Sequence, residues 1–189
     1  MGRIVTSLAL AALGFAVSGC SMVAPAYSPS VDNIQTLRTS GPGPARVGTF
    51  TTTPGPATPN PIQLRANTLR SPYGGTGGTF SAYLSEAVTR ELAMAGRLSP
   101  TSDVEVSGTL LRNELDAAIG TGTGDISARF VVRKAGTVRY DQVKSVHREW
   151  ESSFAGAVAI PKAATEYGYT VQALLALLYA DAAFLDALK

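Results

Sequence analysis

The apolar positions in the middle of the chain change from a strand period to a helix period. Residues 62–66 alternate apolar and polar side chains, which is typical of a half-buried strand. A glycine-rich loop follows, and apolar residues then recur at spacings of three and four along residues 80–95. This spacing predicts an amphipathic helix, for which Thr79 is a suitable N-cap and Gly96 a suitable residue just past the C-terminus.

Alternation then returns and predicts three strands, of which the last two form a hairpin. The first covers residues 103–111 and the hairpin covers residues 125–143. A three-residue loop, Lys134 to Gly136, with Gly136 left-handed, is a favoured connection. A two-residue loop would set Val132 against Arg139, so the apolar pattern favours the longer loop. The expected cross-strand pairs are Val132 with Val138, Phe130 with Tyr140 on the buried face, and Arg129 with Asp141 on the solvated face.

The C-terminal residues 161–189 carry a continuous apolar stripe at helical spacing and predict one long helix. The element order is therefore β-α-β-β-β-α. Because both helices are amphipathic rather than apolar all round, they should pack on one face of the sheet. We expect an α+β fold with a mainly antiparallel sheet of about four strands.

The N-terminus predicts export and lipidation. Residues 1–19 contain a charged start and a short apolar run, as in a secretory signal peptide, and end before the only cysteine, Cys20. Val17-Ser18-Gly19-Cys20 resembles the bacterial lipobox, in which the cysteine is acylated and becomes the first residue. The alternative is an ordinary signal peptide with an incidental cysteine. Ser21, at the position after the cysteine, resembles the signal for the outer membrane, so we expect an outer-membrane lipoprotein facing the periplasm.

Residues 20–61 are rich in Pro, Gly, Thr and Ser, and we expect them to form a solvated tether that carries the lipidated cysteine. Within this segment, residues 45–52 contain enough β-formers to dock as an edge strand, and the sequence leaves that alternative open. The domain itself is expected to cover residues 62–189.

The chain offers little chemistry. The loop at residues 73–79 lacks the Lys-Ser/Thr pair of a phosphate-binding loop, although a weak anion site at the following helix stays open. The only histidine, His147, has no second His or Cys with which to bind a metal. A net charge of +2 argues against nucleic acid as a partner. We expect no catalytic centre, no metal and no cofactor.

The whole pattern resembles the small proteobacterial outer-membrane lipoproteins of the transport-auxiliary and YajG-like kind. Several stretches also resemble a family of uncharacterised proteobacterial lipoproteins over residues 62–189, namely SPYGG, AYLSEA, SGTLLRN, ARFVVRKAGTVRYDQVK, WESSFAGAVAIP and LYADAAF. The resemblance implies envelope location and an α+β fold, and it brings no catalytic residues with it. An acyltransferase label is sometimes attached to such proteins, but the hexapeptide repeats of sugar-nucleotide acyltransferases are absent from this sequence.

Two functions are compatible with these patterns. The favoured one is a non-enzymatic module, held at the membrane by lipid on Cys20, that binds an envelope protein in transport, assembly or maintenance. The expected docking residues lie in the strand region: Arg129, Arg133, Arg139, Lys144 and Trp150. The alternative is a periplasmic enzyme acting on lipid or glycan, with Glu149 and Glu151 as its acid and base.

Overall fold

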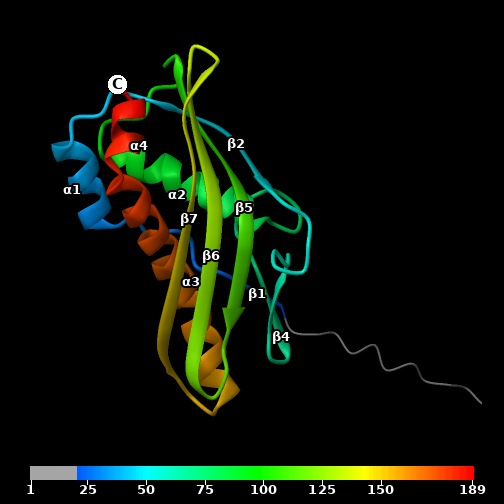
Figure 1. Ribbon diagram of the computed structural model, residues 1–189. Coiled ribbons are helices and arrows are strands. Elements are labelled where there is room, and N and C mark those ends of the chain that lie inside the picture. The colour runs from blue at the N-terminus through cyan, green and yellow to red at the C-terminus, as the bar shows by residue number, and fades with distance from the viewer. Residues whose placement is uncertain (1–20) are drawn as a thin grey trace, which may run out of the picture.

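A four-stranded sheet forms the centre of the protein (Figure 1). In the computed structural model, which describes residues 21–189, the strand order is β2-β5-β6-β7. The last three strands are antiparallel, and β2 pairs with β5 in parallel. Their bounds are Arg46–Thr52 for β2, Val104–Asp116 for β5, Gly120–Lys134 for β6 and Thr137–Ser152 for β7. The α+β class and the mainly antiparallel sheet are confirmed.

A second, smaller sheet has the order β1-β4-β3, with bounds Ser21–Val23, Asn67–Arg70 and Ile62–Leu64. The strand expected at residues 62–66 is thus half of a short hairpin and does not join the main sheet. The chain reverses at Arg65, whose φ of 51° lies in the left-handed region. The alternation of residues 62–64 is real, but it continues for only three residues before this turn.

All four helices of residues 21–189 lie on one side of the main sheet (Figure 1). Their bounds are Val31–Thr39 for α1, Phe80–Met94 for α2, Gly156–Tyr179 for α3 and Ala182–Ala187 for α4. Helix α2 has the expected ends, because the Thr79 hydroxyl accepts from the Ala82 N–H and Gly96 has a φ of 72°. The single C-terminal helix was a wrong prediction: Asp181 accepts from the Ala183 N–H and starts α4 as a separate helix.

The β6–β7 hairpin forms as expected, but its predicted register is wrong. Its turn has two residues, Ala135 and Gly136, with φ values of 48° and 83°. A bulge after Val132 then leaves Arg139 without a partner in the ladder, so that Val132 pairs with Tyr140. The bulge returns Tyr140 to the buried face, but Val138, which the longer loop would have placed there, is 48% exposed. The left-handed conformation of Gly136 is confirmed.

The tether expected at residues 20–61 is not what the structure shows. Residues 21–52 supply β1, α1 and β2, and the open alternative of an edge strand at residues 45–52 is realised by β2. Five apolar residues of this segment are buried in the same core as the helices, namely Ala24, Tyr27, Ile34, Leu37 and Ala45. The domain boundary at residue 62 is therefore also wrong, because the core begins at Ala24. Cys20 and the signal peptide lie outside the described residues.

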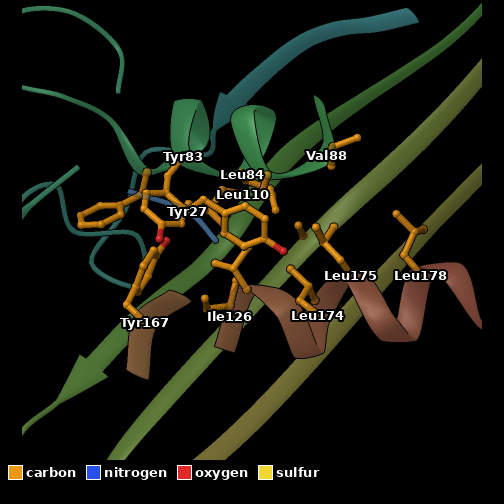
Figure 2. Packing of buried hydrophobic residues seen from close by; sticks show 14 of the residues in the cluster. Tyr27, Tyr83, Leu84, Val88, Leu110, Ile126, Tyr167, Leu174, Leu175 and Leu178 are labelled. Atoms are coloured by element: carbon orange, nitrogen blue, oxygen red, sulfur yellow. The ribbon is translucent and has the colours of Figure 1, made fainter. Parts of the chain in front are cut away.

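A buried glutamate holds the N-terminal segment in place. Glu91 of α2 is fully buried, and it accepts hydrogen bonds from the Tyr27 hydroxyl at 2.6 Å and the Ser30 N–H at 2.9 Å. The Asn33 amide donates to both Glu91 oxygens and to the Gln172 carbonyl of α3. Figure 2 shows Tyr27 beside Tyr83, and their rings meet edge to face at 5.9 Å. Burial raises the pKa of Glu91, and the hydrogen bonds oppose this shift.

Candidate functional site: the open face of the sheet

Among residues 21–189, no helix covers one face of the main sheet, and most side chains on this face are polar. Strands β5, β6 and β7 each alternate, so that every second side chain packs under α2 and α3 and the others face away from them. Near the middle of β2 and β5, most side chains that face away from the helices bear hydroxyls, whereas the charged ones lie mainly on β6 and β7. The outward-facing set includes Thr49, Thr51, Ser107, Thr109, Asp125, Ser127, Arg129, Val131, Arg133, Asp141, Val143, Ser145, His147 and Glu149.

Arg129 and Arg133, two of the residues predicted from the sequence for docking, both lie on this open face. The Arg129 guanidinium donates to both carboxylate oxygens of Asp141. The two residues are diagonal neighbours, because Arg129 stands opposite Val143, so the expected contact forms in a different register. The Arg129 guanidinium holds the pKa of Asp141 below its ordinary value. Both arginines and Asp141 line a shallow hollow with hydroxyl-bearing residues of β2 and β5.

A second polar group on the open face surrounds His147. Its Nδ1 lies 3.0 Å from Asp125 and its Nε2 lies 3.3 Å from Glu149. The hydrogen bonds to Asp125 and Glu149 raise the pKa of His147. Glu149 and Glu151 are exposed residues on β7, and Glu149 is a partner of His147 in a solvated cluster. This is the geometry of a charged surface rather than of an acid–base pair enclosed away from water.

β7 is the longer of the two edge strands of the main sheet. β7 has 16 residues and pairs with β6 on one side, and no other strand among residues 21–189 pairs with its far side. Val138 and Val143 are exposed along it, and Arg139 projects at the bulge. A row of backbone N–H and C=O groups with free hydrogen-bonding capacity is a template for another strand.

Lys144 and Trp150 do not lie on the open face. Lys144 points to the helical side and donates to Asp181 at 2.7 Å, so its ammonium group lowers the pKa of that carboxyl. Trp150 is only 8% exposed and packs against β6. A Cβ atom at Gly122 would lie 2.4 Å from the Trp150 Nε1, so this glycine makes room for the indole. Glycine recurs at every second position of the facing strand, at residues 120, 122 and 124, and Gly122 stands opposite Trp150. This alternation of glycines is the sequence signal for a buried tryptophan.

The glycine-rich loop before α2, considered above as a weak anion site, makes hydrogen bonds within the protein itself. In the glycine-rich loop, the Thr79 N–H donates to the Tyr73 carbonyl and the Gly78 N–H donates to the Gly75 carbonyl. Thr79 also caps α2, so the start of that helix already has internal partners. Within residues 21–189, no group of three or more His, Cys, Asp or Glu side chains is arranged to hold a metal. No helix in this range is both long enough and apolar enough to cross a membrane.

Comparison with solved structures finds the fold in protein XCC0632 of Xanthomonas campestris, described with the family-model DUF330. That chain is 14% identical, the match covers 84% of this chain and 91% of that chain, and the TM-score is 0.58. This likeness shows the fold alone. Weaker matches include CT253 of Chlamydia trachomatis, at 13% identity over 77% of this chain and 98% of that chain with a TM-score of 0.47. Lipoprotein GNA1162 of Neisseria meningitidis matches at 14% identity over 70% and 99%, with a TM-score of 0.32. No family model and no curated protein matches the chain.

Proposed function

We propose that this protein is an outer-membrane lipoprotein, anchored through Cys20, whose periplasmic domain binds an envelope protein. The single observation that carries the proposal is the combination of an open polar sheet face with the free edge of β7. Such an edge binds an extended segment by strand addition, in which backbone hydrogen bonds supply affinity and side chains on the sheet supply specificity.

The side chains beside the edge suit a polar partner. Arg129 and Asp141 neutralise each other, whereas Arg133 and Arg139 are exposed and have no carboxylate partner among the described residues. Val143, which is 51% exposed, supplies an apolar contact in the middle of β7. An extended segment with acidic side chains at one end and an apolar residue at its centre would match this arrangement.

The anchoring part of the proposal has its own test. Cells that express the full chain are labelled with a fatty-acid analogue, and membranes are fractionated. The intact protein should carry label and sediment with the outer membrane, because two or more acyl chains hold a protein stably in a bilayer. A Cys20→Ala variant that still carries label would disprove lipidation at this residue.

The docking part is tested by a photo-crosslinking amino acid at Val143 in living cells, followed by mass spectrometry. The matched control position is Gln35, which is exposed on α1 away from the sheet face. We expect one defined envelope protein from position 143 and none from position 35. The recovered protein should bind the purified domain, and this binding should be lost with Val143→Asp but kept with Val31→Asp, because Val31 is exposed on α1.

The opposite result would favour the enzyme alternative. If no protein is recovered at Val143, and if purified domain turns over a lipid or glycan and loses this activity with Glu149→Gln, the docking proposal is wrong.

A further inference from the structure

One end of the molecule exposes apolar side chains from two neighbouring connections. Ile119 lies between β5 and β6, Phe154 lies between β7 and α3, and Val158 lies in the first turn of α3. Their exposed fractions are 72%, 80% and 57%. All three line one hollow, with Lys162 at its side. We call these four residues the apolar end. Grouped apolar side chains on a surface mark a contact with a partner or a membrane.

The apolar end is fixed in position by Arg65. This residue, in the β3–β4 turn, donates to the carbonyl oxygens of Ala117 at 2.6 Å, Ser153 at 2.8 Å and Phe154 at 3.0 Å. Its guanidinium therefore joins the small sheet to both connections that carry the exposed side chains. Three hydrogen bonds from one charged group hold the two loops against each other.

The described chain begins at this same end. β1 runs parallel to β4, and Ser21 stands opposite Thr68, three residues after Arg65. Three residues of strand span about 10 Å. Because the strands are parallel, the first residue of β1 lies at the end of the small sheet where the β3–β4 turn lies. Figure 1 shows the β5–β6 turn and the beginning of α3 together at the lower end of the molecule.

We propose that the apolar end rests in the lipid surface that holds the acyl chains of Cys20. The inference rests on the proposed lipidation of this residue. Ser21 is already paired in β1, so Cys20 alone would separate the acyl chains from the folded domain. One extended residue spans at most about 3.6 Å. Because this connection is so short and begins beside the apolar end, the acyl chains would hold Ile119 and Phe154 at the membrane surface.

The chemistry of the apolar end fits a lipid surface. Phe154, Ile119 and Val158 are the kinds of side chain that enter the boundary between headgroups and acyl chains. Lys162 lines the same hollow, and a lysine at such a surface can lay its methylene stem along apolar side chains while its ammonium group binds headgroup phosphates. Glu151 also borders the hollow and would be repelled by anionic lipid. The attraction is therefore mainly apolar, and it should depend little on the charge of the lipid.

The test measures how deeply each end of the main sheet lies in a lipid bilayer. Full-length lipidated protein carrying Phe154→Cys or Thr137→Cys is spin-labelled and placed in vesicles of phosphatidylethanolamine and phosphatidylglycerol. The acylated thiol of Cys20 does not react, so only the new cysteine takes the label. Thr137 is exposed at the opposite end, beside the β6–β7 turn. The accessibility of each label to oxygen, which concentrates in lipid, is compared with its accessibility to a water-soluble nickel chelate.

We expect a ratio of oxygen to nickel accessibility several-fold higher at position 154 than at position 137. Protein that floats with the vesicles while position 154 is as open to the nickel chelate as position 137 would overturn the inference and leave anchoring intact. Protein with an intact Cys20 that does not float would instead overturn the anchoring, and the inference with it.

Discussion

Residues 21–52 and the hairpin of β6 and β7 both extend the core, but they are held there by different interactions. The hairpin follows from alternation: its strands pair along their whole length, and one face is buried under α3. The N-terminal segment has little alternation and few apolar residues. A handful of buried side chains and the hydrogen bonds of Glu91 hold it instead. A segment with the composition of a linker can thus be an integral part of a fold.

The largest expected effect comes from Leu37, which is completely buried in α1. Leu37→Ala should lower the free energy of unfolding by about 2–5 kcal/mol, because it leaves a cavity in a shared core. Chemical denaturation of the protein measures this loss. Val31→Ala is the control on the exposed side of the same helix and should change stability by less than about 0.5 kcal/mol. Equal, small effects at both positions would mean that α1 is peripheral.

Glu91→Gln should lower stability at neutral pH by about 1–3 kcal/mol, because its amide N–H group would face the Asn33 amide, which donates to both Glu91 oxygens. It should also change the pH dependence. Because burial raises the pKa of Glu91 in the folded protein, the folded state binds a proton there more tightly than the unfolded chain. The stabilisation from this protonation is present below the ordinary pKa of 4.5 and is lost as pH rises through the folded-state pKa.

The free energy of unfolding of the wild-type protein, measured by denaturation, should therefore fall as pH rises through the folded-state pKa of Glu91. The Glu91→Gln variant should lack this fall. Glu149→Gln, on the exposed face, is measured in the same way as a control. An unchanged slope in the Glu91 variant would show that Glu91 is not the titrating group.

The hairpin is tested at its turn. Gly136 has a φ of 83°, and a β-branched residue is poorly tolerated there. Gly136→Val should cost about 1–3 kcal/mol in thermal unfolding. Ala135→Gly is the matched variant: Ala135 also has a positive φ, of 48°, so glycine at this position should be neutral or stabilising. A loss of stability with Ala135→Gly would count against the two-residue turn.

The smallest effect is expected at Arg129. Its ion pair with Asp141 is exposed, so water and salt screen it, and Arg129→Ala should leave the melting temperature almost unchanged. Thermal unfolding at low and high salt measures this. A loss as large as that of Gly136→Val would mean that the open face contributes to stability as the buried face does.

The same two regions show what could be predicted from the sequence. Alternation identified the hairpin strands, but the bulge at Arg139 inserts one residue that alternation does not reveal, so the register was wrong. In the N-terminal segment, the composition predicted a tether, because Tyr27 and Leu37 have mostly small and polar neighbours in the sequence. One signal was present: Glu91 interrupts the apolar stripe of α2, three and four residues after Val88 and Ala87. A charge at such a position calls for buried partners from elsewhere in the chain.

The candidate site was predictable only in part. The outward residues of β6 could be placed from their period, and Arg129 and Arg133 lie on the open face accordingly. The place of Lys144 depends on Asp181, which a break between two helices brings over β7. The apolar end depends on contacts between loops far apart in the sequence, such as Arg65 with Phe154, and no local pattern reports these.

The parallel pairing of β1 with β4 has a mechanical consequence. A pull on the chain before Ser21 acts along the axis of β1, so it loads the hydrogen bonds between the two strands in shear and together. An antiparallel pairing opened from its free end would break its bonds one at a time. Behind β1, the Ala24 N–H bonds to the Arg70 carbonyl at 2.8 Å, and the Tyr27 ring is locked in the core. Tension at the N-terminus is therefore carried straight into the centre of the protein.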